Sequence, residues 1–176
     1  VTHTNAHAYI IDDVEISDIN KDGKNDIIGW GILGELFVFD GAKKYAKVEI
    51  FDPPVLGGDF LIFDVDGNNL PDIVVQDRGA GQLIVLYQTS SLQFNKTEIL
   101  ESNWNNKGLS QMASGDLDGD DDLDLVFPEN GNIDGDLSWF ENINGKLFRH
   151  LIYTELKGAR IPKFADVDQD GDQDIL

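Results

Sequence analysis

Hydrophobic residues along the chain come in short runs, separated by polar stretches rich in Gly, Asn and Asp. The runs recur in sets of four, and one complete set covers residues 60–63, 73–75, 83–87 and 94–100. β-branched and aromatic residues dominate these runs, which predicts short β-strands. No window keeps a hydrophobic period of 3.6 residues, so we expect no long helix.

The four runs of a set differ in their pattern. The first three are apolar on both faces, as in the 36–39 and 83–87 segments, which predicts strands covered on both sides by other sheets. The fourth run alternates with charged residues, as in the 45–50 and 94–100 segments, which is typical of an exposed edge strand. Each set therefore predicts four strands that end at the molecular surface.

Acidic clusters mark the repeat. Four nine-residue clusters carry Asp or Asn at positions 1, 3 and 5 and Asp at position 9, and they begin at Asp18, Asp64, Asp116 and Asp166. Their first residues lie 46, 52 and 50 residues apart, which indicates an array of repeats of about 50 residues. Four strands in about 50 residues match one blade of a β-propeller. The alternative is a β-sandwich in which the acidic turns coincide by chance.

We predict an all-β fold, a β-propeller of four-stranded antiparallel blades that forms one partial domain over residues 1–176. The predicted repeats cover approximately residues 9–52, 56–101, 108–153 and 159–176, the last being only the start of a fourth. Three blades cannot close a ring, because each blade needs neighbours on both faces. We therefore expect a fragment of a longer protein, or, as a less favoured alternative, a second copy that supplies the missing blades.

The acidic clusters have the composition of calcium loops. Ca²⁺ takes six to eight oxygen ligands from carboxylates, amide and backbone carbonyls and water. Side chains at positions 1, 3, 5 and 9 and the backbone carbonyl at position 7 would supply them. The candidate ligands are Asp18, Asn20, Asp22, Lys24 and Asp26; Asp64, Asp66, Asn68, Leu70 and Asp72; Asp116, Asp118, Asp120, Asp122 and Asp124; and Asp166, Asp168, Asp170, Asp172 and Asp174.

Position 6 of such a loop needs a left-handed backbone, which suits Gly23, Asn69 and Gly171 and suits Asp121 less well. Position 12 is not Glu, and we expect strands rather than helices on either side, so the loops are not EF-hands. We expect about four Ca²⁺ per chain. The alternatives are Mg²⁺, which prefers strict octahedral geometry, and Asx-rich turns without metal. The lack of clustered His and Cys disfavours zinc.

Charge narrows the range of partners. The chain has 33 acidic and 13 basic residues, a formal net charge of −20 and no cysteine. This balance argues against nucleic acid and against anionic lipid, which attract basic surfaces. No apolar run approaches the roughly 20 residues that span a bilayer, so we expect no membrane insertion.

The loops and their flanking strands resemble the FG-GAP/VCBS repeats, the blades of integrin-α-like propellers. The resemblance rests on the pattern Asp-x-Asp-x-Asp-Gly-x-x-Asp followed by two apolar residues, and on the 137–150 segment. It implies calcium at all four loops and a seven-bladed ring in an exported or surface protein. The chain departs from the pattern at Asn20, Asn68, Asn69 and Asp121.

We expect a calcium-stabilised module that binds carbohydrate or protein outside the cell, secreted or at the cell surface. One alternative is the scaffold or catalytic part of a propeller-type polysaccharide lyase or hydrolase, and another is a self-assembling structural subunit. No catalytic residue and no bound organic cofactor is predicted, since no nucleophile motif appears. Trp104 lies on a polar loop and is a candidate for stacking on a sugar ring.

Overall fold

The computed structural model of the chain describes residues 11–31, 35–51, 58–77, 80–100, 111–129, 135–156, 158 and 160–176. Throughout these residues the secondary structure is β, without a helix, so the all-β prediction is confirmed. Accordingly, this part of the chain holds no helix long and apolar enough to cross a membrane.

Three antiparallel sheets have four strands each, in the order in which the strands follow along the chain. The first sheet consists of β1 (Ile11–Ser17), β2 (Asp26–Gly31), β3 (Leu36–Asp40) and β4 (Ala46–Phe51). The second consists of β5 (Phe60–Phe63), β6 (Asp72–Asp77), β7 (Gln82–Ser90) and β8 (Gln93–Leu100). The third consists of β9 (Ala113–Gly115), β10 (Asp124–Glu129), β11 (Asp136–Asn142) and β12 (Leu147–Tyr153).

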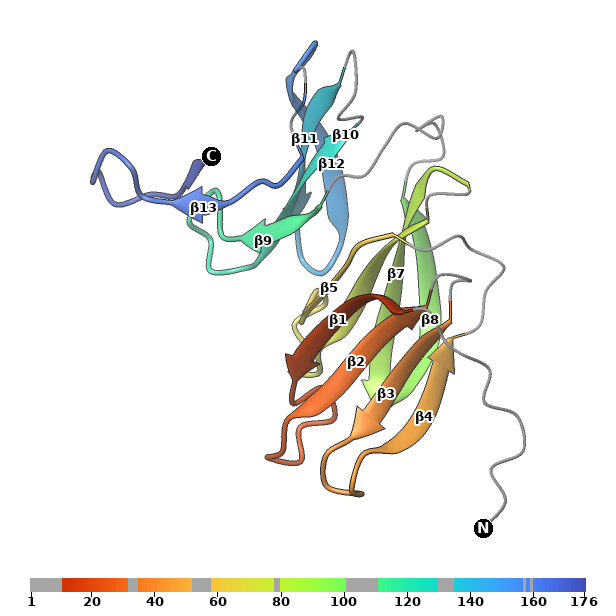
Figure 1. The fold of residues 1–176 in the computed structure, drawn as a ribbon. Coiled ribbons are helices and arrows are strands. Elements are labelled where there is room, and N and C mark those ends of the chain that lie inside the picture. The colour runs from red at the N-terminus through yellow and green to blue at the C-terminus, as the bar shows by residue number, and fades with distance from the viewer. Residues whose placement is uncertain are drawn as a thin grey trace.

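A fourth, two-stranded sheet pairs β13 (Phe164–Ala165) with β14 (Asp174–Ile175). The first strand of the fourth sheet is shorter than the predicted run at 161–165, whereas the predicted run at 109–113 lies partly outside the described residues. Pro162, which has no N–H to donate, precedes β13. The first strands β5, β9 and β13 neighbour one another in turn along one side of the molecule (Figure 1).

Successive sheets pack face to face through two separate hydrophobic cores. The first core joins Ile28 and Leu36 of the first sheet to Ile73 and Val75 of β6. The second joins Val74 of β6 to Leu125 and other side chains of the third sheet. Because neighbouring residues of β6 point to opposite faces, the second sheet is covered on both sides and every residue of β6 is buried.

The predicted pattern of apolar inner strands and a polar outer strand holds for the third sheet at β10 and β12, whereas β1 of the first sheet exposes Ile11, Val14 and Ile16. The fourth strand β12 exposes most of its residues, whereas all residues of β10 are buried. The described sheets do not close into a ring (Figure 1). The four-stranded antiparallel unit is therefore confirmed, and the ring of seven stays a prediction.

Candidate metal centre

Each acidic cluster forms the turn between the first and second strands of its sheet. Residues 18–26 join β1 to β2, and residues 64–72 join β5 to β6. Residues 116–124 join β9 to β10, and residues 166–174 join β13 to β14. Position 9 is in every case the first residue of the second strand. The loops thus lie between strands, as the sequence predicts.

The carboxylate at position 1 organises each turn by accepting backbone N–H groups from the same loop. The two oxygens of Asp18 accept the N–H groups of Asp22 and Gly23 at 3.0 and 2.9 Å. The same pair of bonds recurs in the second and third loops, at 2.7–3.2 Å, from Asp64 and from Asp116. In the fourth loop Asp166 keeps only the bond to the N–H of Gly171, at 3.2 Å.

Two positions in every loop have a left-handed backbone. The predicted position 6 is left-handed in all four loops, with φ from +66° to +102°, and this includes Asp121 at +73°. Position 4 is left-handed as well, at Lys21, Gly67, Gly119 and Gln169, with φ from +57° to +79°. Glycine signals this conformation in the second and third loops, whereas Lys21 and Gln169 give no signal in the other two, because Lys and Gln have no special preference for it.

Position 5 completes the turn with its side chain. Its oxygen accepts the N–H of position 7, as in the bonds from Lys24 to Asp22 at 2.9 Å and from Leu70 to Asn68 at 2.7 Å. The same bond is present in the third and fourth loops, at 3.0 and 3.3 Å. This bond fixes the peptide unit between positions 6 and 7. The role of the position-7 carbonyl as a ligand, at Lys24, Leu70, Asp122 and Asp172, stays a prediction.

The aspartate at position 9 ties the loop to the third strand of the sheet. Asp72 is buried, and its Oδ2 accepts the N–H of Val65 at 2.8 Å while its Oδ1 accepts the N–H of Gln88 at 2.7 Å. Asp124 makes the corresponding bonds with Leu117 and Asn142, at 3.0 and 2.8 Å. Position 9 therefore supports the fold whether or not it also binds a metal ion.

Asp26 differs from the other position-9 residues. It is buried, and its Oδ1 accepts the N–H of Gly41 at 2.8 Å. Its Oδ2 has no hydrogen-bond partner among the described residues. Burial raises the pKa of Asp26, and the neighbouring charges of Asp40 and Asp22 add to this, against the lowering effect of the Gly41 N–H. A buried carboxylate oxygen without a partner is unfavourable, and a bound cation would stabilise it.

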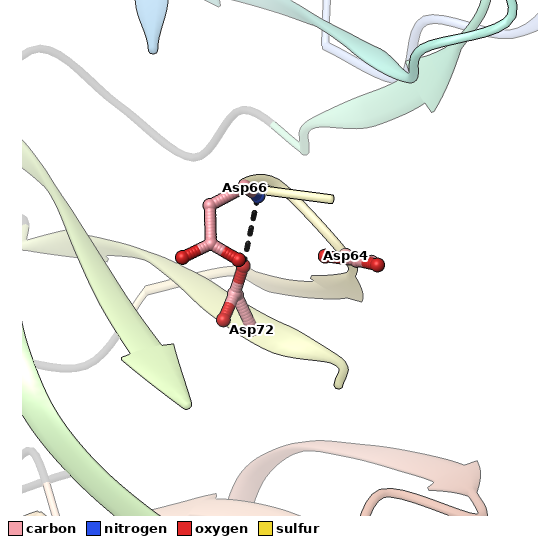
Figure 2. A group of neighbouring side chains, drawn as sticks. All are labelled: Asp64, Asp66 and Asp72. Carbon is pink, nitrogen blue, oxygen red and sulfur yellow. Dashed lines mark hydrogen bonds between the residues drawn. The ribbon is translucent and has the colours of Figure 1, made fainter. Parts of the chain in front are cut away.

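In three loops the carboxylates come together closely enough to share one ion. One oxygen from each of three residues lies within 4.8 Å of the others in the groups Asp64, Asp66 and Asp72; Asp116, Asp118 and Asp120; and Asp166, Asp168 and Asp174. Figure 2 shows the carboxylates of Asp66 and Asp72 pointing toward one another, and the dashed bond joins the Asp66 N–H to Asp72 at 3.4 Å.

The remaining acidic candidates lie outside these groups, namely Asp18, Asp22, Asp26, Asp122, Asp124, Asp170 and Asp172. In the first loop, position 3 is the amide Asn20, which is buried. Trp104, the candidate for binding a sugar, lies outside the described residues.

The donor set fits calcium. Oxygens within 4.8 Å of one another can surround one Ca²⁺ at its usual Ca–O distance of roughly 2.3–2.6 Å. Crowding of like charges also acts on the loops: burial and the neighbouring Asp120 and Asp124 raise the pKa of Asp118. Burial raises the pKa of Asp72 to about 6, although the N–H groups of Gln88 and Val65 oppose it. A bound divalent cation would favour the charged carboxylates and so oppose both of these pKa increases.

Two residues near the loops are functional candidates that sequence reasoning missed. Gln88 and Asn142 end apolar runs on β7 and β11, and both are buried. Their N–H groups bind the position-9 carboxylates, and their side chains also reach the loops. A polar amide at the same place in two repeats is the only signal that the sequence offers for them.

The described chain thus belongs to the all-β repeat proteins in which a four-stranded sheet recurs with an acidic loop between its first two strands. Residues 64–127 match the model of the FG-GAP-like repeat, from position 1 of the second loop into β10. This segment is therefore an FG-GAP-like repeat, and the resemblance stated from the sequence is confirmed for it. The comparison with curated proteins gave no match.

Proposed function

We propose that the chain is part of a calcium-stabilised β-propeller and that the four acidic loops bind Ca²⁺. The observation that carries this proposal is the gathering of three carboxylate oxygens within 4.8 Å in each of three loops. The unpartnered buried oxygen of Asp26 supports occupancy of the first loop, where no such group of three acids is present. The hydrogen bonds within the loops alone would also suit Asx-rich turns without metal.

The proposed ring has seven blades. This number rests on the FG-GAP-like match over residues 64–127. The complete burial of β6 between two neighbouring sheets supports closure of a ring, because a blade of this kind is stable only with a partner on each face. We propose further that the propeller is a module that binds carbohydrate or protein outside the cell. The FG-GAP-like match over residues 64–127 and the strongly acidic charge support this role over a role with nucleic acid.

Calcium binding is tested by isothermal titration calorimetry of the chain after removal of metal. We expect about four sites per chain, and fewer than two would contradict the proposal. The double substitution Asp64→Asn and Asp66→Asn should remove one site, because it takes two carboxylates from a single group. The control is Glu49→Gln on the exposed face of β4, which should leave the number of sites unchanged.

The biological role is tested by a glycan array combined with an assay for lyase activity. Binding of glycans without turnover would support the binding module. A rise in unsaturated uronate absorbance with an acidic polysaccharide would contradict it in favour of the lyase alternative. A discrete oligomer or fibre at micromolar concentration, without binding of any glycan, would contradict it in favour of a structural subunit.

A further inference from the structure

We propose that Gln88 and Asn142 couple each metal loop to the sheet that follows it, so that the calcium affinity of one loop depends on the next repeat. This inference rests on the proposed function and concerns the regulation of the same loops. Gln88 and Asn142 are positioning residues in this scheme. They act through the backbone of the loops rather than by binding the ion.

The side-chain amide of Gln88 contacts two loops at once. Its Nε2 donates to the carbonyl of Pro71 in its own sheet at 2.7 Å and to the carbonyl of Ile19 in the first loop at 3.0 Å. Its Oε1 accepts the N–H of Leu92, in the turn between β7 and β8, at 2.6 Å. Gln88 is fully buried, so these bonds are made away from bulk water.

Asn142 repeats this arrangement one sheet further along. Its Nδ2 donates to the carbonyl of Val65 in the second loop at 2.9 Å and, at 3.4 Å, to that of Leu123 in its own sheet. Its Oδ1 accepts the N–H of Gly145, in the turn between β11 and β12, at 3.0 Å. Asn142 is also buried. The same contacts therefore occur at two successive sheet junctions.

The contacted carbonyls occupy equivalent places in the loops. Ile19 and Val65 are position 2 of the first and second loops, and Pro71 and Leu123 are position 8 of the second and third. In the first sheet Gly41 stands at this place, since its N–H binds the position-9 carboxylate of Asp26. Glycine has no amide side chain, so the first sheet itself offers no such contact to a preceding loop.

The position-2 carbonyl belongs to the peptide unit that leads into the position-3 ligand. Gln88 therefore fixes the peptide that precedes Asn20, and Asn142 fixes the peptide that precedes Asp66. Gly145 reinforces the second case, because a Cβ on it would lie 2.8 Å from the Cα of Asp66. A ligand that is already held in place binds metal more tightly, since less ordering is needed on binding.

Coupling of this kind is reciprocal. If the second sheet orders the first loop for calcium, calcium in the first loop stabilises the docking of the second sheet by the same factor. Substitution of groups that orient metal ligands typically lowers metal affinity 10–100-fold. We expect a change of about tenfold, at the lower end of that range, because the amides act through the backbone.

The test resolves the loops individually. Calcium is titrated into the ¹⁵N-labelled chain while the amide signals of Gly23, Gly67 and Gly119 report the first, second and third loops. Gln88→Met is close in size to wild type but has no side-chain amide. It should lower the calcium affinity of the first and second loops about tenfold and leave that of the third loop unchanged. Asn142→Leu should weaken the second and third loops and leave the first unchanged. Gln76→Met is the matched control, because Gln76 is a buried glutamine of β6 away from the loops.

The outcomes separate this inference from the proposed function. If the wild-type chain shows no calcium response at these three signals, the proposed function fails and the coupling fails with it. If the wild-type chain responds but each variant weakens only the loop of its own sheet, calcium binding stands and the coupling is wrong. Equal weakening of all three loops, or the same change in Gln76→Met, would indicate general destabilisation and would also overturn the coupling. Should Gln88→Met not fold, the pattern of Asn142→Leu decides alone.

Discussion

At the scale of single residues, Asp59 is a buried acidic side chain outside the loops whose protonation should affect stability. It precedes β5, it is buried, and its Oδ2 accepts the N–H of Met112 at 2.5 Å, which links the second sheet to the third. Burial, together with a hydrogen bond to Asp13, raises the pKa of Asp59 to about 7, although the Met112 N–H opposes the shift. Because Asp13 belongs to β1, these two acidic side chains lie between the first and second sheets.

Asp59→Asn should change how stability depends on pH. Between about pH 4 and pH 7 the folded wild type keeps a proton that the unfolded chain has released, so its free energy of unfolding falls as the pH rises through this range. Asparagine does not titrate in this range and can still accept the Met112 N–H. Relative to wild type, the variant should gain up to about 1.4 kcal/mol per pH unit between pH 4 and 7.

Urea unfolding at several pH values, with calcium held constant, measures this difference directly. Glu49→Gln, an exposed substitution on β4, serves as the control for removal of one carboxylate. A difference between Asp59→Asn and wild type that stays constant from pH 4 to pH 7 would show that Asp59 does not hold a proton in the folded state.

At the scale of elements, turns and loops of neighbouring sheets fit against each other through small residues. Gly67, at position 4 of the second loop, and Gly145, in the turn between β11 and β12, are both left-handed, with φ of +72° and +79°. A Cβ at Gly67 would meet nothing within 4 Å, whereas a Cβ at Gly145 would lie 2.8 Å from Asp66 Cα. Substitution at Gly67 therefore tests backbone strain alone, and substitution at Gly145 tests backbone strain together with crowding between two sheets.

Alanine at these two glycines should destabilise the protein unequally. Gly67→Ala should lower the free energy of unfolding by about 1–2 kcal/mol, because only the left-handed backbone is strained. Gly145→Ala should lower the free energy of unfolding by about 1–3 kcal/mol more than Gly67→Ala, because the turn must also move away from the second loop. Thermal or urea unfolding in saturating calcium measures both, and equal losses would mean that the turn does not press on the loop.

Much of this element-level organisation follows from the sequence, and the exceptions have a physical cause. Alternation and spacing predicted the four-stranded units and the loops, and the needs of a tight turn predicted the left-handed position 6. The amide contacts were not predictable, since Gln88 lies 69 residues from Ile19 and Asn142 lies 77 residues from Val65. Only the docking of whole sheets brings those atoms together. Position 4 was missed although it is glycine in two loops, because Lys21 and Gln169 adopt the same conformation in the other two and neither residue favours it.

At the scale of the whole molecule, negative charge and packing act against each other. The chain carries a formal charge of −20, and its loops concentrate carboxylates at one end of each sheet. Four Ca²⁺ would add +8 and bring the formal charge to −12. Self-repulsion of an acidic surface destabilises a compact state, so bound cations should favour folding beyond their direct contacts.

Chelation should therefore lower the melting temperature by many degrees. At ten times the dissociation constant, each site stabilises the folded state by about 1.4 kcal/mol, and four sites give on the order of 5–6 kcal/mol. This rivals the whole stability of an ordinary domain, about 5–15 kcal/mol. Millimolar Mg²⁺ should restore little, because it demands octahedral geometry and keeps its waters. Circular dichroism melting curves with calcium, with chelator and with chelator plus Mg²⁺ measure the effect.

The two cores that join the three complete sheets would melt together with the loops, because Gln88 and Asn142 link the loops to the same sheet junctions that the cores hold together. A midpoint that does not move on chelation would mean that the acidic loops are turns without a metal, and the proposed function would have to be abandoned.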